Sequence, residues 1–112
     1  QMIGTCEAFA MAEKLGLDPQ KFYDISSVSS GQCWSMTSYC PVPGPGPQSP
    51  SDNDYQGWFA SALMLKGLKL AMEAAETSGA KVPMGARAKE LYEALVVASN
   101  GGLDFSAIIR TL

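Results

Sequence analysis

The sequence predicts an all-α fold. No segment of the 112 residues shows sustained alternation of apolar and polar side chains, the pattern of a half-buried strand. Helix start and stop signals instead divide the chain into about five helical segments. Hydrophobic residues make up 46% of the chain, which is enough for a packed core. We therefore expect residues 1–112 to form a single helical domain.

The first two helices are predicted at the N-terminal end of the chain. The alanine-rich composition of residues 2–15 favours a helix, and Gly16 suits the position directly after its end. Asp18 can then cap a second helix that starts at Pro19, where the missing N–H costs nothing. This helix fades over residues 26–31. The side chains expected to face inwards are Phe22, Ile25 and Val28.

Residues 31–57 are predicted to form a long ordered loop. The segment holds five of the seven prolines, so regular structure is disfavoured. It also carries Trp34, Tyr39 and Tyr55, and disordered linkers contain few aromatic residues. Loops of this length are uncommon in compact domains and usually serve a function. We expect this one to pack against the helices.

The longest helix is predicted over residues 58–78. It is apolar around much of its circumference, as a central helix should be, and Gly79 ends it. Leu63, Leu70 and Ala74 share one broad face, and Leu65, Leu68, Met72 and Ala75 continue around the helix.

Two further helices are predicted in the C-terminal part. One begins at Pro83 and runs to about Ala98, until Asn100-Gly101-Gly102 breaks it. Its inward residues are Leu91, Leu95 and Val96. Asp104 can cap a short last helix. The apolar side of that helix is expected to carry Phe105, Ile108, Ile109 and Leu112.

Composition argues against several classes of function. The net charge is −3 and no basic run occurs, which argues against a nucleic-acid partner or an anionic membrane surface. No apolar run approaches the roughly 18 residues of a spanning helix. Histidine is absent, so Ser-His-Asp and Cys-His catalysis and histidine metal ligands are excluded. The three cysteines form no CxxC motif, and we expect free thiols in a reducing compartment and no metal site.

Lys66 and the loop aromatics are the candidate functional residues, and each allows two interpretations. Lys66 lies in the most hydrophobic helix, seven residues after Phe59 and about 10 Å from it along the axis. It either extends to the surface or offers a cation to an anion in a cleft. Trp34 and Tyr39 either pack the loop down or line a pocket. Cys33 is expected to be a packing residue.

Sequence motifs in the loop resemble those of a known family. The run SSGQCWSMTSYCPVPGPGP, with the spacing Phe59-x3-Leu63-x2-Lys66 after it, resembles the C-terminal domain of 3-hydroxyisobutyrate dehydrogenases, which are β-hydroxyacid dehydrogenases. The resemblance covers nearly the whole chain. It implies the 6-phosphogluconate dehydrogenase-like helical domain of a two-domain enzyme, used for substrate binding and dimerisation. The N-terminal Rossmann domain of such enzymes is absent from these 112 residues.

The resemblance also implies roles for individual residues. Trp34, Tyr39 and Phe59 match substrate-binding positions, and Lys66 matches a lysine that reaches the nicotinamide end of NAD. No catalytic residue is expected in this chain, because the family's catalytic lysine lies upstream. One departure concerns Gly67, which stands where the family usually has aspartate.

The implied function is the NAD-dependent oxidation of (S)-3-hydroxyisobutyrate to methylmalonate semialdehyde in valine breakdown. Two alternatives stay open: a related dehydrogenase or semialdehyde reductase with another short substrate, and a non-catalytic helical association module. We expect the fragment alone to be inactive and to form a homo-oligomer. The expected location is the bacterial cytoplasm, or the mitochondrial matrix in a eukaryote.

Overall fold

The computed structural model describes the backbone of residues 1–112 and all side chains except those of residues 99 and 100. The regular secondary structure of the described residues is helical apart from one isolated antiparallel bridge between Ala60 and Asp104, which confirms the all-α prediction. The elements are α1 (Met2–Lys14), α2 (Pro19–Ser26), α3 (Trp34–Thr37), η1 (Pro50–Asn53), α4 (Ser61–Ser78), α5 (Pro83–Leu95), η2 (Val96–Asn100) and η3 (Phe105–Thr111). The elements η1 and η3 are 3₁₀ turns, and η2 is π-helical.

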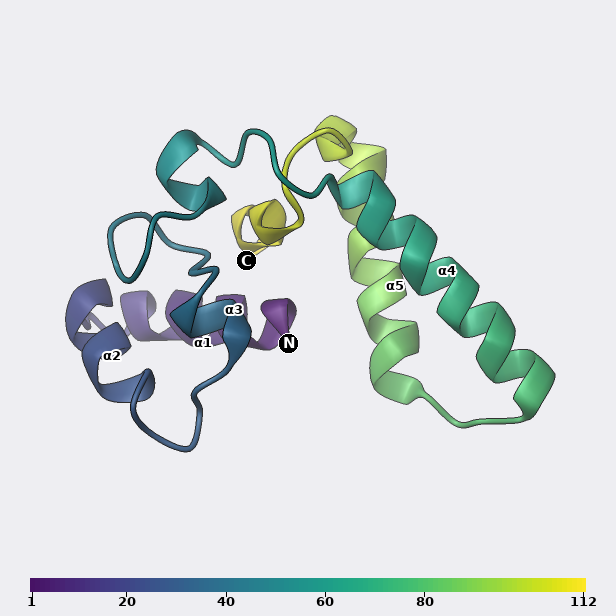
Figure 1. The fold of residues 1–112 in the computed structure, drawn as a ribbon, viewed down its shortest axis with the longest axis horizontal. Helices are drawn as coiled ribbons and strands as arrows, with labels where there is room; N and C mark the ends of the chain where they lie inside the picture. The colour runs from purple at the N-terminus through teal and green to yellow at the C-terminus, as the bar shows by residue number, and fades with distance from the viewer.

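The elements form two parts that meet at η3 (Figure 1). Helices α1 to α3 and the long loop form one part, and α4 and α5 form an antiparallel hairpin that projects from the other side. A buried cluster joins the two parts. It consists of Met2, Cys6, Tyr39, Leu65, Tyr92, Leu95, Phe105 and Ile108. Because these residues come from both parts and from η3, the core fixes the loop against the hairpin.

The predicted ends of the first two helices are confirmed. Gly16 has a φ of 78°, and the N–H of Leu17 donates to the carbonyl of Ala12 at 3.0 Å, which closes the end of α1. The Asp18 carboxylate accepts from the backbone N–H of Lys21 at 3.0 Å, so it caps α2 as expected.

The expectation that Ile25 and Val28 face inwards is wrong. Their exposed fractions are 70% and 85%. Helix α2 ends at Ser26, before Val28. Its packed side carries Phe22, as predicted, together with Tyr23. The ring of Phe22 meets that of Phe9 edge-on at 4.9 Å. The helix is therefore held against α1 by one narrow side.

The long loop is ordered, as predicted, and its own polar groups hold it. The Asp52 carboxylate accepts from the backbone N–H groups of Gly44 and Ser49, both at 2.9 Å. The hydroxyl of the buried Tyr55 donates to the carbonyl of Pro41 at 2.7 Å. Contrary to the expectation of no regular structure, α3 and η1 each add one helical turn. Both lie outside the densest proline run.

Helix α4 begins at Ser61, three residues later than predicted. Residues 57–60 form a non-helical strap that pairs with residues 103–105. The N–H of Phe105 donates to the carbonyl of Phe59 at 2.8 Å, and the N–H of Ser61 donates to Leu103 at 2.8 Å. Trp58 has a φ of 57°, which is incompatible with a right-handed helix. Tertiary pairing therefore overrides the apolar helical pattern of this segment.

The prediction of a central position for α4 is also wrong. Leu63 and Leu70 are 53% and 56% exposed, whereas Leu65 is buried and Leu68 packs against the core. Within the described chain, α4 packs mainly against α5, with smaller contacts to η2 and η3, so one side of it stays uncovered. Its predicted end is confirmed, because Gly79 adopts a φ of 73°.

Most of the C-terminal predictions hold for the described residues. The expectation that Leu112 faces inwards is wrong, because Leu112 follows the end of η3 and is 41% exposed. Helix α5 starts at Pro83, and the helical path continues through η2 to Asn100, whose side chain lies outside the described part. The predicted inward residues Leu95 and Val96 contribute to the core. Asp104 caps η3 by accepting from the N–H of Ser106 at 2.9 Å. Among the described residues, no helix has the length and apolar character needed to cross a membrane.

Candidate functional site

Five aromatic rings meet where the loop, the strap and η3 converge. We call this cluster the aromatic wall; it consists of Trp34, Tyr39, Trp58, Phe59 and Phe105. The ring of Tyr39 is its centre. Tyr39 stacks on Trp34 with ring centroids 4.8 Å apart and meets Trp58 edge-on at 5.3 Å. Phe105 lies 5.3 Å from Tyr39 and touches Phe59 edge-on at 5.9 Å. The structure thus brings together the three aromatic residues predicted for the site.

The aromatic wall has a buried base and an exposed surface. Tyr39 and Phe105 are each 6% exposed, whereas Trp34, Trp58 and Phe59 are 51%, 67% and 43% exposed. The exposed rings can contact a ligand, and the buried rings hold them in place. Sequence reasoning missed Trp58, because that residue was assigned to the helix that starts three residues later. Phe105 was expected only as a core residue.

A buried carboxylate anchors the base of the wall. The side chain of Asp104 is fully buried and accepts four hydrogen bonds from described residues. Its Oδ2 accepts from the hydroxyl of Tyr39 at 2.6 Å and from the N–H of Phe59 at 3.0 Å. Its Oδ1 accepts from the N–H and the hydroxyl of Ser106 at 2.9 and 2.6 Å. These four donors compensate the loss of water around the buried charge.

The hydroxyl of Tyr39 is committed to this carboxylate. Burial raises the pKa of Tyr39 above its usual value, and the hydrogen bond to Asp104 raises it further. The phenol therefore stays protonated and directed into the protein. Tyr39 can contribute its ring to a substrate site, but its hydroxyl already has a partner.

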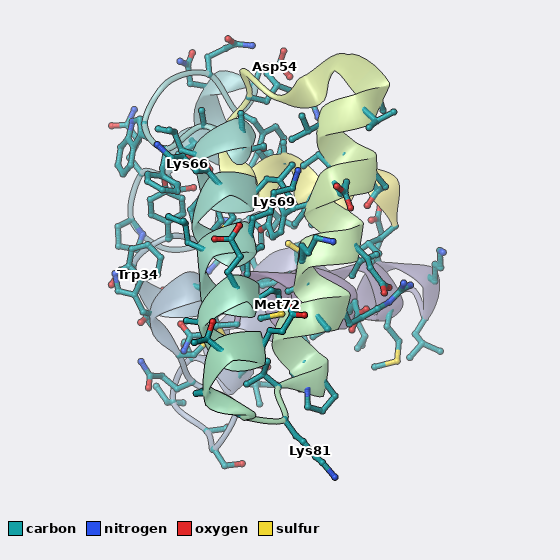
Figure 2. The ribbon with its side chains drawn as sticks, turned by 90° about the vertical axis from the view of Figure 1, so that its right-hand side faces the viewer. Trp34, Asp54, Lys66, Lys69, Met72 and Lys81 are labelled. Carbon is teal, nitrogen blue, oxygen red and sulfur yellow. The ribbon has the colours of Figure 1, made fainter. Side chains whose placement is uncertain are left out.

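Lys66 lies on the uncovered side of α4. Within the part of the chain whose side chains are described, its Nζ forms no hydrogen bond or ion pair. Lys69, one turn away, instead turns to α5 and pairs with Glu93 at 3.4 Å. Figure 2 shows Lys66 on the left-hand side of the view, where Trp34 also lies, and Lys69 between the two helices. The ammonium of Lys66 is therefore available to an anion.

The predicted relation between Lys66 and Phe59 is not found. Phe59 belongs to the strap and lies outside α4, so the two residues do not share a helix face. Lys66 lines a surface hollow of about 320 Å³ on α4, together with Ala62, Leu65, Lys69, Leu70 and Glu73. Trp34 and Phe105 instead line an apolar cavity of about 250 Å³ between the two parts of the fold.

Gly67 leaves open space beside Lys66. It is exposed in the middle of α4, and a Cβ at this position would have no heavy atom within 4 Å outside its chain neighbours and the backbone of its own helix turn. The backbone of α4 thus tolerates a side chain here.

The three cysteines are free thiols, as expected. Burial raises the pKa of Cys6 to about 12, so that thiol stays neutral near pH 7. Cys33 is half-buried and its Sγ lies 3.3 Å from Oγ1 of Thr5. This contact fits a packing role for Cys33. The described residues contain no group of three or more acidic or cysteine side chains that could hold a metal ion.

The all-helical fold is shared with the helical part of a solved dehydrogenase, which gives the class of protein: the helical domain of a dehydrogenase-like protein. Over residues 1–112 the chain matches the family described as NAD-binding of NADP-dependent 3-hydroxyisobutyrate dehydrogenase. The chain belongs to this family, which confirms the resemblance seen in the sequence. The family description also agrees with a nicotinamide dinucleotide as the cofactor.

Named relatives and solved structures agree with the family. A probable 3-hydroxyisobutyrate dehydrogenase of Mycobacterium tuberculosis is 47% identical over 112 residues, which are 100% of this chain and 38% of the relative. The mitochondrial 3-hydroxyisobutyrate dehydrogenase of Homo sapiens is 40% identical over 111 residues, 99% of this chain and 33% of the relative. The chain thus spans little more than a third of the length of these relatives.

Two solved structures share the fold. The Mycobacterium tuberculosis 3-hydroxyisobutyrate dehydrogenase with L-serine superimposes with a TM-score of 0.92 at 46% identity, covering 98% of this chain and 38% of that one. The Salmonella typhimurium 3-hydroxyisobutyrate dehydrogenase has a TM-score of 0.84 at 23% identity, covering 99% of this chain and 36% of that one. At that identity the second likeness concerns the fold alone.

Proposed function

We propose that residues 1–112 are the substrate-binding and dimerisation domain of a two-domain, NAD-dependent 3-hydroxyisobutyrate dehydrogenase. The whole enzyme would oxidise (S)-3-hydroxyisobutyrate to methylmalonate semialdehyde in valine breakdown. The observation that carries this proposal is the 47% identity, over the full chain, to a relative of that name. The exposed rings of the aromatic wall support it, because a short branched hydroxy acid has an apolar body to be enclosed.

The residues of this chain would bind and orient the reactants. When bound, the dinucleotide accepts the hydride of the substrate alcohol. Trp34, Phe59 and the ring of Tyr39 would form the apolar side of the substrate site and exclude water. The Lys66 ammonium fits a cofactor contact, since it is exposed and has three N–H donors for a ribose hydroxyl or an amide oxygen. We assign no catalytic residue to this chain.

Kinetics of the full-length protein test the proposal. NAD-dependent oxidation would be measured for a panel of short hydroxy acids, with the isolated 112-residue chain as the control. We expect turnover of (S)-3-hydroxyisobutyrate by the full-length protein and none by the isolated chain. Turnover by the isolated chain would contradict the assignment of catalysis to residues outside it.

A related short substrate is the second candidate function. Gly67 has open space around its Cβ position on α4, and one solved relative is described together with L-serine, which is also a 3-hydroxy acid. The panel should therefore include L-serine and the reduction of small semialdehydes. If kcat/KM is higher for one of these compounds than for (S)-3-hydroxyisobutyrate, that compound is the substrate and the reaction class stays the same.

The uncovered face of α4 supports a homo-oligomer. Leu63 and Leu70 are each more than half exposed on a helix that the rest of the described chain leaves open on one side. A purely associative module without catalysis would have the same exposed apolar face. Activity of the full-length protein therefore distinguishes an enzyme domain from such a module. We place the protein in the bacterial cytoplasm, or in the mitochondrial matrix in a eukaryote, since several eukaryotic relatives are named as mitochondrial.

A further inference from the structure

Asp104 connects two candidate substrate-binding residues through a single oxygen atom. Its Oδ2 accepts hydrogen bonds from the hydroxyl of Tyr39 at 2.6 Å and from the backbone N–H of Phe59 at 3.0 Å. The Asp104 side chain is 0% exposed, so it cannot itself touch a substrate. Any influence of Asp104 on a ligand must therefore pass through the groups that it holds.

The other oxygen of Asp104 serves a separate purpose. Oδ1 accepts from the N–H of Ser106 at 2.9 Å and from its hydroxyl at 2.6 Å, and thereby caps η3. One oxygen faces the aromatic wall and the other faces the C-terminal turn. This division allows the two roles of the carboxylate to be tested separately.

The strap requires such an anchor because its backbone is strained. Trp58 has a φ of 57°, a left-handed conformation that bulky residues rarely adopt and that persists only when the surroundings enforce it. The next residue, Phe59, donates its N–H to Asp104 and accepts from the N–H of Phe105 at 2.8 Å. These two bonds fix the direction in which the exposed rings of Trp58 and Phe59 leave the backbone.

We propose that Asp104 is a positioning residue for substrate binding. Its carboxyl group fixes the ring of Tyr39 and the strap relative to each other, so that Trp34, Trp58 and Phe59 present one rigid apolar surface. The ring of Trp34 is included because it stacks on Tyr39. A carboxylate suits this task because both of its oxygens accept hydrogen bonds. An amide would place an NH₂ group, which only donates, against either the donors of Tyr39 and Phe59 or those of Ser106. This inference rests on the proposed function of the aromatic wall.

A matched pair of variants tests the inference in the full-length protein. Tyr39→Phe and Ser106→Ala each remove one hydroxyl that donates to Asp104 at 2.6 Å, one on each oxygen. We expect Tyr39→Phe to raise KM for the hydroxy acid about fivefold, the scale of one typical lost hydrogen bond, with little change in KM for NAD. Ser106→Ala should leave both KM values within about twofold while lowering stability.

Asp104→Asn completes the set. If it folds, it should raise KM for the hydroxy acid as Tyr39→Phe does, and the double variant should show no further increase, because both changes break the same contact. Equal changes in KM for Tyr39→Phe and Ser106→Ala, or unchanged KM for Tyr39→Phe, would overturn the positioning role.

A spectroscopic measurement separates this inference from the proposed function. In the full-length protein labelled with fluorotryptophan, the fluorine resonances of Trp34 and Trp58 report their ring environments directly. Tyr39→Phe should shift or broaden both resonances, and Ser106→Ala should leave them in place. If the enzyme oxidises none of the hydroxy acids but the resonances respond in this way, the proposed function fails and the positioning by Asp104 stands. Resonances that are insensitive to Tyr39→Phe would contradict the positioning whatever the reaction.

Discussion

The hydroxyl of Tyr39 donates to the carboxylate of Asp104 at 2.6 Å across 65 residues of sequence. This contact ties the proline-rich loop to the start of the C-terminal turn, and both groups are buried. It also limits what Tyr39 can do at a substrate site, because only its ring is free to act. The polar chemistry of the candidate site is then left to other groups, such as Lys66, an exposed cation on α4 that forms no ion pair with the described residues.

Replacing Gly67 with alanine should stabilise the 112-residue chain. Gly67 is exposed in the helix interior with open space around its Cβ position, and glycine there costs about 1 kcal/mol relative to alanine. Urea unfolding should show a higher midpoint for Gly67→Ala. The matched control is Gly79→Ala, which should lose about 1–2 kcal/mol because Gly79 has a φ of 73°. A destabilised Gly67→Ala would contradict the open space found around this position.

Removing the Lys66 ammonium should weaken cofactor or substrate use in the full-length protein. A charge-assisted hydrogen bond is worth about 1–3 kcal/mol. The kcat/KM of Lys66→Ala should therefore fall by about 5-fold to 150-fold. Lys69→Ala is the control, since Lys69 lies on the same helix but pairs with Glu93 on α5. If Lys66→Ala and Lys69→Ala have the same kinetics as the unchanged protein, Lys66 only extends to solvent.

The chain should lose stability in alkaline solution between about pH 10 and pH 12. Burial raises the pKa of Tyr55 from 10 to about 12, an increase that nearby Arg110 partly opposes. The folded state holds this proton more tightly than the unfolded state, so the stabilisation is complete below pH 10 and is lost as the pH rises towards 12. Urea midpoints measured across this range should fall, and less steeply in Tyr55→Phe. An identical slope in that variant would assign the decline to other groups, such as Cys6, whose pKa burial raises to about 12.

Association should involve the uncovered face of α4. We expect sedimentation of the 112-residue chain at tens of micromolar to show a dimer or a larger assembly, because Leu63 and Leu70 are exposed there. Leu70→Lys should shift the distribution towards monomer, since a lysine on that face would have to be buried on association. Met84→Lys, at an 81% exposed residue at the start of α5, serves as the surface control. A monomer at these concentrations would contradict the association proposal.

Much of the local structure could be predicted because its causes are local. Asp18 and Asp104 cap the helices that follow them, since a carboxylate two or three residues ahead of an N–H can reach it without help from distant parts of the chain. Gly16 and Gly79 end helices for the same kind of reason: each adopts the left-handed conformation that glycine alone tolerates freely. The aromatic residues of the loop indicated correctly that it is ordered.

The candidate site was only partly predictable. Trp34, Tyr39 and Phe59 were recognised by resemblance, and ring contacts through Tyr39 and Phe105 bring them together. The apolar pattern around Trp58 resembles a helix, so the strap was missed. Its conformation depends on pairing with residues more than 40 positions away, as in the bond from Ser61 to Leu103.

The sequence by itself determined the helical class, the helix ends with local caps and the family, because short-range geometry and characteristic motifs specify each of them. Only the tertiary structure decided which side of α4 is covered and that Asp104 lies beneath the aromatic wall. Both depend on which distant segments meet. A carboxylate is placed in the interior only where separate parts of the chain supply enough donors to replace water, and the spacing of residues in a sequence does not show where those donors converge.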